Sequence, residues 1–277
     1  MDAVTPIELN DGRSMPAIGF GTWQLRGEDG VDAVRTALES GYRMIDTATR
    51  YENEGAVGRA VAESGLPREN LFITTKLPGD DHGYDSTLRA CEDSLTRLGL
   101  QYVDLYLIHW PLPRIDKYVD TWRAFIALRE QGLVRSIGVS NFTGAHIDRL
   151  VRETDVVPAV NQIEMHPLFP QSRQRAYDRE QGIVTQSWSP LGRKSDLLVS
   201  PLLAEIADAH AVSVGQVVLR WHVEMGAVPL PKSAHSGRIA QNHDIFDFTL
   251  GADELEAIGT LDRDQRLGGD PDTHEEF

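Results

Sequence analysis

The sequence predicts a (β/α)8 barrel, in which eight parallel strands form a closed ring inside a layer of helices. Apolar runs of strand length alternate with amphipathic stretches along most of the chain. Most of these runs are nearly continuous in apolar residues and end in a polar residue, as expected for strands buried on both faces. A length of 277 residues suits one such barrel and no linker-like stretch divides it, so we expect a single domain over residues 1–277.

Eight runs are the candidate strands of the barrel. They are Gly19–Thr22, Met44–Asp46, Leu71–Lys76, Val103–His109, Ser136–Ser140, Ala159–Glu164, Ile183–Trp188 and Ala227–Leu230. Before the first of them, Ile7–Leu9 and Met15–Ile18 flank a turn sequence ending in Asp11-Gly12. Asp-Gly favours a tight hairpin turn, and we expect this N-terminal β-hairpin to close the bottom of the barrel.

The intervening stretches carry apolar side chains at helical spacing. Val31, Val34 and Leu38 share one face of the first predicted helix, and Ser213 is a candidate N-cap for a later one. The last ten residues, 268–277, are polar and predict a loose C-terminal tail.

The net charge of −15 argues against a nucleic-acid partner, because binding to phosphates needs a basic surface. The N-terminal residues lack the basic and apolar regions of a signal peptide, and no apolar run approaches about 20 residues. We therefore expect a cytoplasmic protein without a membrane segment. The single cysteine, Cys91, lies among leucines at helical spacing and is expected to be buried.

A barrel of this type carries its active site at the carboxyl ends of its strands. Asp46, Lys76 and His109 end the second, third and fourth predicted strands, and Tyr51 follows in the loop after the second. A lysine ammonium lowers the pKa of a neighbouring tyrosine, and a carboxylate makes a buried ammonium tolerable. We therefore predict that Tyr51 donates a proton to a carbonyl oxygen that His109 orients. An Asp46–Lys76 pair with only a structural role is the alternative.

Several segments, in order, resemble signatures of the aldo-keto reductase family. They are Gly41–Gly58, Leu105–Pro111, Gly138–Phe142, Asn161–Pro167 and Pro231–Ser233, and the resemblance runs from about Ile7 to about Leu261. It implies a catalytic tetrad of Asp46, Tyr51, Lys76 and His109. It also implies an oxidoreductase that reduces aldehydes and ketones to alcohols with NADPH.

The resemblance implies a cofactor site along the barrel rim. Ser140, Asn141 and Gln162 would hold the nicotinamide carboxamide, Trp188 would stack on the ring in place of the usual tyrosine, and Ser189, Leu191 and Gly192 would cover the pyrophosphate. Lys232, Ser233, His235 and Arg238 would surround the 2′-phosphate, Asn242 would touch the adenine, and Thr22, Trp23 and Asp46 are further expected contacts.

The substrate site is expected to include Trp23, Tyr51, His109 and Trp110. The loops 77–84, 111–118 and 189–200 are short, which suggests an open, shallow pocket for small dicarbonyls, glyoxals or keto-sugar acids. The remaining histidines show no metal-ligand spacing, so no metal is expected. We expect a monomer. The competing hypothesis is a regulatory or structural barrel that binds nucleotide with little turnover.

Overall fold

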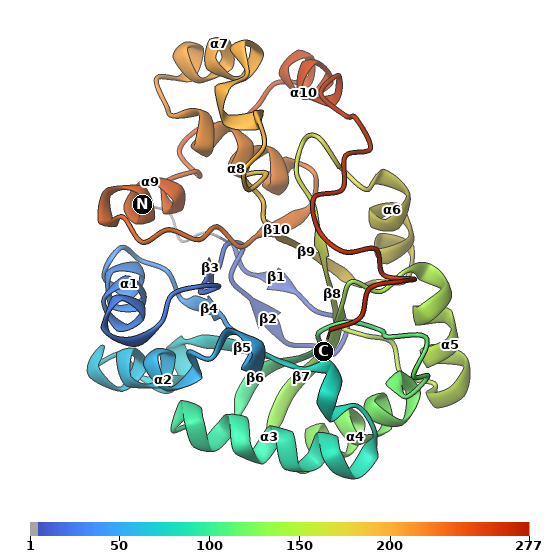
Figure 1. The fold of residues 1–277 in the computed structure, drawn as a ribbon. Helices are drawn as coiled ribbons and strands as arrows, with labels where there is room; N and C mark the ends of the chain where they lie inside the picture. The colour runs from blue at the N-terminus through green and yellow to red at the C-terminus, as the bar shows by residue number, and fades with distance from the viewer. Residues whose placement is uncertain (1–4, 277) are drawn as a thin grey trace.

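The computed structural model describes residues 5–276 and contains the predicted ring of parallel strands (Figure 1). The eight strands lie in the sheet in their order along the chain, each parallel to the next. They are β3 (Phe20–Gly21), β4 (Met44–Asp46), β5 (Phe72–Leu77), β6 (Val103–Ile108), β7 (Val134–Ser140), β8 (Val160–Glu164), β9 (Val184–Trp188) and β10 (Ala227–Pro229). The predicted (β/α)8 fold is confirmed.

Two backbone hydrogen bonds join the first and last strands and close the barrel. The amide of Gly19 donates to the carbonyl of Pro229 at 3.1 Å, and Gly21 donates to Pro231 at 3.0 Å. A Cβ atom on Gly19 would lie only 2.6 Å from Leu230 Cδ2 and 2.8 Å from Met44 Cε. Glycine therefore lets the two edge strands approach closely enough to bond.

The N-terminal hairpin lies at the amino-terminal end of the barrel. Its strands β1 (Ile7–Glu8) and β2 (Ser14–Met15) pair antiparallel, and Gly12 takes the positive φ of 81° that the turn needs. Met15 packs in one apolar cluster with the barrel residues Leu105 and Val160. The hairpin thus closes the bottom of the barrel, as predicted, with shorter strands than the apolar runs suggested.

Helices surround the strands on the outside (Figure 1). They are α1 (Gly27–Glu39), α2 (Glu54–Glu63), α3 (Tyr84–Leu98), α4 (Tyr118–Glu130), α5 (Gly144–Thr154), α6 (Ser172–Glu180), α7 (Pro201–His210), α8 (Val214–Glu224), α9 (Ser236–His243) and α10 (Ala252–Gly259). The faces predicted from spacing are buried, Val31, Val34 and Leu38 among them. Cys91 is also buried, which raises the pKa of its thiol to about 12.

Two helices stand outside the βα repeat. They are α7, which precedes α8 between β9 and β10, and α10, which follows α9. Residues of α7, α8 and α10 pack together in one apolar cluster that includes Leu203 and Ile258. No single helix in residues 5–276 is long and apolar enough to cross a membrane; α7 and α8, bent by 88°, pass that test only as a pair and only by length and composition.

The C-terminal segment is not the loose tail that its polarity suggested. Residues 268–276 run across the open face of the barrel, where Figure 1 shows the chain in red near its C-terminus. Backbone amides of Leu267 and Gly268 donate to the two carboxylate oxygens of Glu164 at 2.6 and 2.8 Å. Glu164 is 1% exposed, and a buried carboxylate needs such donors. Phe277 lies outside the described residues.

Candidate active site

A cleft of about 1200 Å³ opens at the carboxyl ends of the strands, where the barrel fold places active sites. Most of the residues expected from sequence line it. They are Thr22, Trp23, Asp46, Tyr51, His109, Trp110, Ser140, Asn141, Gln162, Trp188, Ser189, Leu191 and Lys232. Another cavity, of about 840 Å³, lies beside the hairpin at the opposite end, away from all of these groups.

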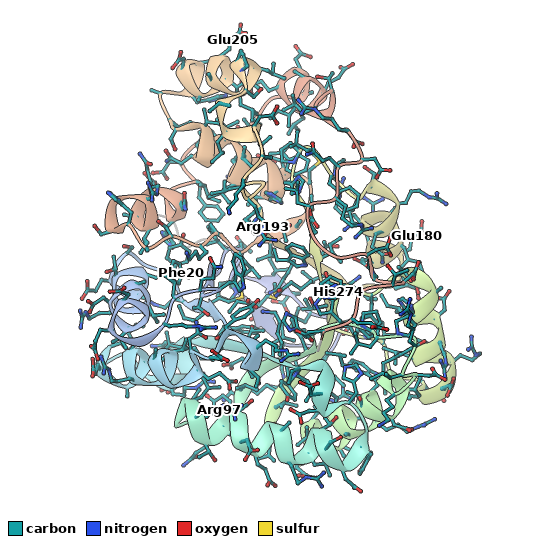
Figure 2. The ribbon with its side chains drawn as sticks, viewed as in Figure 1. Phe20, Arg97, Glu180, Arg193, Glu205 and His274 are labelled. Carbon is teal, nitrogen blue, oxygen red and sulfur yellow. The ribbon has the colours of Figure 1, made fainter. Side chains whose placement is uncertain are left out.

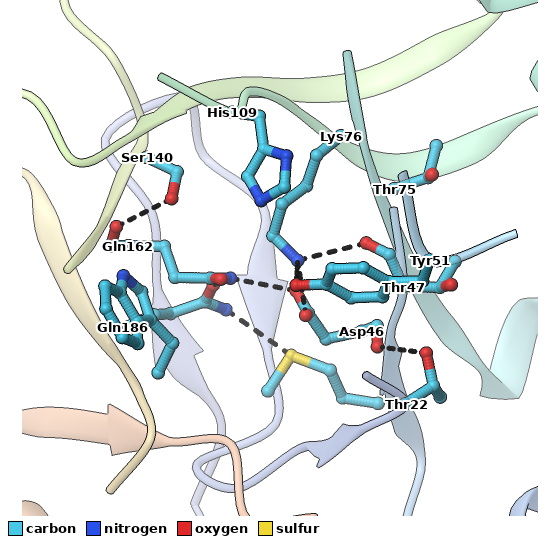
Figure 3. Close-up of polar contacts among 12 residues, drawn as sticks. Thr22, Asp46, Thr47, Tyr51, Thr75, Lys76, His109, Ser140, Gln162 and Gln186 are labelled. Atoms are coloured by element: carbon cyan, nitrogen blue, oxygen red, sulfur yellow. Dashed lines mark hydrogen bonds and ion pairs between the residues drawn. The ribbon is translucent and has the colours of Figure 1, made fainter. Parts of the chain in front are cut away.

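Lys76 lies at the centre of the predicted tetrad (Figure 3). Strands β4 and β5 are neighbours, and Asp46 lies opposite Thr74. Lys76 is two residues after Thr74, so its side chain lies on the same face of β5 as Thr74 and extends from just beyond the end of β4. The Lys76 ammonium donates to Asp46 Oδ1 at 2.5 Å, to the Thr47 carbonyl at 3.0 Å and to Tyr51 Oη at 3.4 Å. Burial alone would lower the pKa of Lys76, but Asp46 and Tyr51 outweigh it and the net shift is upward. Lys76 therefore carries its charge at neutral pH.

Tyr51 ends a 3₁₀ turn, Thr49–Tyr51, that follows β4. Burial raises the pKa of Tyr51 above its ordinary value, and the Lys76 ammonium opposes that rise. Lysine acts in the predicted direction, but the net shift is opposite to the lowered pKa that the sequence suggested, because desolvation of a buried phenol is the larger effect. The phenol therefore holds its proton at neutral pH, which suits a proton donor.

His109 follows β6 directly and faces Tyr51 across the cleft, with ring centroids 5.9 Å apart. Its backbone is fixed on both sides, since its amide donates to Leu77 at 3.2 Å and its carbonyl accepts from Asn141 Nδ2 at 3.0 Å. The imidazole Nδ1 lies 2.5 Å from a carboxylate oxygen of Glu276. That contact connects the C-terminal segment to the tetrad.

The remaining oxygen of Asp46 is held by one amide side chain, that of Gln162, from the opposite side of the barrel. Gln162 Nε2 donates to Asp46 Oδ2 at 2.8 Å and to Gln186 Oε1 at 3.0 Å, and Ser140 Oγ donates to the Gln162 carbonyl at 2.9 Å (Figure 3). Thr22 Oγ1 donates to the Asp46 carbonyl at 2.9 Å. The predicted polar strand ends therefore form one connected network around the Asp46–Lys76 pair.

The groups expected around a nicotinamide gather on the β7 to β9 side of the cleft. Trp188 ends β9 and its indole Nε1 donates to Asn141 Oδ1 at 2.8 Å. Gly268 passes so close to the indole that a Cβ there would lie 2.3 Å from Trp188 Cη2. The indole face, together with the amides of Asn141 and Gln162, offers the stacking surface and the polar atoms that a nicotinamide carboxamide needs.

The basic residues expected around a phosphate follow β10. Lys232 lines the cleft and Arg238 lies in the first turn of α9, both exposed and without an ion-pair partner within residues 5–276. His235 Nδ1 caps α9 by accepting from the Arg238 amide at 3.4 Å, and Ser233 Oγ accepts from the His235 amide at 3.0 Å. Two unpaired cations at a helix N-terminus suit a phosphate dianion.

Not every expected cofactor residue lies in the cleft itself. Gly192 is in the loop after β9 and Asn242 is buried on α9, and neither lines the cleft. Within residues 5–276 no group of three or more His, Cys, Asp or Glu side chains could hold a metal ion. His166 bonds Glu164 through Nε2 at 3.0 Å.

The sequence reasoning missed four residues of this site. Gln186 had a signal, because it is the middle one of three consecutive polar residues, Thr185, Gln186 and Ser187, in β9. Glu164 had a weaker one, as the acidic end of β8. His274 stacks on Trp110 with ring centroids 4.0 Å apart, and Glu276 contacts His109; both lie in the polar C-terminal segment, where the sequence shows no periodicity.

Comparisons with known proteins agree with this geometry. The chain is 52% identical over 277 residues to 2,5-diketo-D-gluconic acid reductase B of a Corynebacterium strain, with all of both chains covered. It is 47% identical to methylglyoxal reductase DkgA of Escherichia coli K12, with 97% of each chain covered.

Solved structures show the same relationship. An aldo/keto reductase from Brucella melitensis is 51% identical, with a TM-score of 0.91 and coverage of 94% of this chain and all of the other. The NADPH complex of a Gox0644 variant is 44% identical, with a TM-score of 0.95 and coverage of 99% and 100%. Residues 17–263 match the aldo/keto reductase family over the whole barrel, and this chain therefore belongs to that family.

Proposed function

We propose that this chain is an NADPH-dependent carbonyl reductase in which Tyr51 is the proton donor. The observation that carries the proposal is the Tyr51 phenol, 3.4 Å from an ammonium whose charge is balanced by Asp46 at the mouth of the barrel. NADPH, when bound, supplies the hydride to the carbonyl carbon. The residues of the chain then have to orient the carbonyl oxygen and deliver one proton to it.

The proton comes from Tyr51 Oη. As the carbonyl oxygen gains negative charge, it takes the phenolic proton and becomes the alcohol hydroxyl, which leaves a phenolate on Tyr51. Lys76 stabilises that phenolate because its ammonium is fixed beside Oη by Asp46 and the Thr47 carbonyl. His109, on the other side of the cleft, is placed to bond the carbonyl oxygen and hold it toward Tyr51.

The rim of the barrel supports the cofactor part of the proposal. Trp188, Asn141 and Gln162 would hold the nicotinamide, and the loop after Trp188, with Ser189, Leu191 and Gly192, would cover the pyrophosphate. Lys232, Ser233, His235 and Arg238 would bind the 2′-phosphate, with Asn242 at the adenine and Thr22 and Trp23 at the nicotinamide end. The two unpaired cations favour NADPH over NADH.

The substrates that we propose are small carbonyl compounds: dicarbonyls, glyoxals and keto-sugar acids. Trp23 and Trp110 line the cleft beside Tyr51 and His109, and the relatives are named for a diketo acid and for methylglyoxal. We also propose a cytoplasmic monomer, since a net charge of −15 favours a soluble, unassociated protein. Size-exclusion chromatography with light scattering tests the monomer.

The test is NADPH oxidation with methylglyoxal by the wild type and by Tyr51→Phe. We expect the variant to lose at least about 10²-fold in kcat, the scale of a lost general acid, with NADPH affinity nearly unchanged. Tyr84→Phe is the matched control, because Tyr84 is 44% exposed on α3, outside the cleft. A near-normal kcat in Tyr51→Phe would refute the mechanism. Tight NADPH binding without turnover of any carbonyl would favour the regulatory or structural barrel.

A further inference from the structure

The indole of Trp188 is held on two sides by the chain itself. Its Nε1 donates to Asn141 Oδ1 at 2.8 Å, which connects the end of β9 to the residue that follows β7. Gly268 packs against the benzene ring of the same indole, where a Cβ would lie 2.3 Å from Cη2. The C-terminal segment continues from there to His274, which Figure 2 shows over the centre of the barrel. Both the N–H edge of the indole and its opposite end are therefore in contact with fixed parts of the site.

Asn141 extends this contact to the histidine of the tetrad. Its Nδ2 donates to the His109 carbonyl at 3.0 Å and to Ser140 Oγ at 3.1 Å. A donor on the amide oxygen and an acceptor on the amide nitrogen leave the side chain one orientation, because a flipped amide would lose both bonds. The backbone of Asn141 is fixed as well, with a φ of 63° that asparagine tolerates and an amide that donates to the Gln162 carbonyl at 2.9 Å. One asparagine side chain thus joins Trp188 to His109.

The backbone of His109 depends on this asparagine. His109 lies just beyond the last residue of β6, where the regular pairing of the strand ends. Its amide donates to the Leu77 carbonyl at 3.2 Å, and within residues 5–276 its carbonyl accepts from the Asn141 side chain. Without that donor, the end of β6 would be restrained on one side only. The position of the imidazole therefore follows the position of the Asn141 amide.

We propose that Trp188 is a positioning residue, whose indole N–H fixes the stacking surface for the nicotinamide relative to His109 through Asn141. The inference rests on the proposed function. Trp188 would carry the hydride donor and His109 would orient the carbonyl, so the separation of the two reacting carbons follows the separation of these two side chains. A phenylalanine ring would stack without a donor, and the hydroxyl of a tyrosine lies at the tip of its ring. The tryptophan therefore adds a positional restraint to a stacking surface.

The test replaces the indole of Trp188 with benzothiophene, by site-specific incorporation of benzothienylalanine. Sulfur takes the place of the N–H, so the side chain keeps its shape and its stacking face and loses only the donor. The matched control is the same replacement at Trp122, which is buried on α4, does not line the cleft, and donates through Nε1 to the Val156 carbonyl at 3.3 Å. The measurements are the single-turnover rate of NADPH oxidation with excess methylglyoxal, its isotope effect when the transferred hydrogen is deuterium, and the dissociation constant of NADPH.

We expect benzothiophene at position 188 to lower the single-turnover rate about tenfold, the scale of one lost hydrogen bond, with the isotope effect showing that hydride transfer is the slowed step. The dissociation constant of NADPH should stay within about twofold, because the stacking face is unchanged. A general loss of structure would weaken NADPH binding together with the rate. Benzothiophene at position 122 should change neither quantity.

Asn141→Gly decides whether the effect passes through Asn141, since glycine keeps the left-handed backbone and removes the amide. On that background, at saturating NADPH, the replacement at position 188 should lower the rate by less than about twofold. The inference is overturned by an unchanged rate at position 188, by an equal tenfold loss on the Asn141→Gly background, or by a loss confined to NADPH affinity. Failure of the proposed function has a different signature, because the wild type would then oxidise no NADPH with any carbonyl, or Tyr51→Phe would keep its activity.

Discussion

The buried Asp46–Lys76 pair allows a quantitative prediction about stability. Asp46→Ala leaves the Lys76 ammonium, in a side chain that is 1% exposed, with the Thr47 carbonyl and the Tyr51 hydroxyl as its only bonding partners among residues 5–276. Breaking a buried pair by removing one partner costs about 3–5 kcal/mol, because the other charge stays buried without compensation. We expect the free energy of unfolding at pH 7 to fall by that amount.

Deprotonation of Lys76 limits this loss in the free energy of unfolding. Lys76 in the variant can escape its unpaired charge by releasing a proton, which at pH 7 costs about 4.6 kcal/mol for an amine of ordinary pKa about 10.4. The same release costs only about 1.9 kcal/mol at pH 9. The unfolded variant then binds more protons than the folded one, so its stability rises with pH. The difference between wild type and Asp46→Ala should therefore shrink toward about 2 kcal/mol at pH 9.

Urea denaturation of the wild type and the variant at pH 7 and pH 9 measures both effects. In the control, Asp46→Ala combined with Lys76→Met, the difference from wild type should lose this pH dependence, because no ammonium remains to titrate. Asp120→Ala, at the exposed ion pair with Arg123, should cost at most about 1 kcal/mol. A loss below about 1 kcal/mol for Asp46→Ala at pH 7, or a loss equal at both pH values, would refute the reasoning.

Three further predictions concern the C-terminal segment, the cofactor and acid stability. Gly268→Ala places a Cβ 2.3 Å from the Trp188 ring and should displace the C-terminal segment, residues 268–276, which raises KM for methylglyoxal several-fold. Gly259→Ala is the control, because open space surrounds Gly259, and it should leave KM unchanged. Equal effects of the two variants would contradict the role of Gly268. Lys232→Ala and Arg238→Ala should each weaken NADPH binding about tenfold and leave NADH binding unchanged, as measured by fluorescence titration. An equal loss of affinity for both cofactors would argue against a 2′-phosphate site. Burial lowers the pKa of His222 to about 3. The contribution of His222 to the free energy of unfolding is therefore complete above pH 6.5 and falls by about 1.4 kcal/mol per pH unit below that value. In urea denaturation, His222→Gln should reduce the dependence of the unfolding free energy on pH in this acid range by one proton, and an unchanged dependence would contradict the prediction.

The sequence determined the barrel and most of its strand limits. Strands buried on both faces have to be apolar, so their runs could be read directly, and most observed limits fall within two residues of the predicted ones. The start of β7 shows why the limits are not perfect. The strand begins at Val134, two residues before the predicted start, because Arg135 interrupts the apolar run while its guanidinium stacks 3.8 Å above the Tyr102 ring.

The sequence also determined which residues meet at the centre of the site. Consecutive parallel strands end at one rim, so Asp46, Lys76 and His109 had to lie near each other once the strands were assigned. The direction of the pKa shift at Tyr51 could not be read in the same way. It depends on how completely the surrounding chain removes water from the phenol, which is a property of the packed structure.

The role of the C-terminal segment follows from its packing in the folded barrel and from nothing local in the sequence. Its polar residues have no periodicity, so the sequence indicated a loose tail. Three contacts between residues distant in the sequence place it: the Gly268 amide on Glu164, the His274 stack on Trp110, and Glu276 on His109. A carboxylate that the local sequence assigns to solvent is thereby carried into the cleft, because the segment's binding partners lie at the ends of two different strands, β6 and β8, which only the closed barrel brings together.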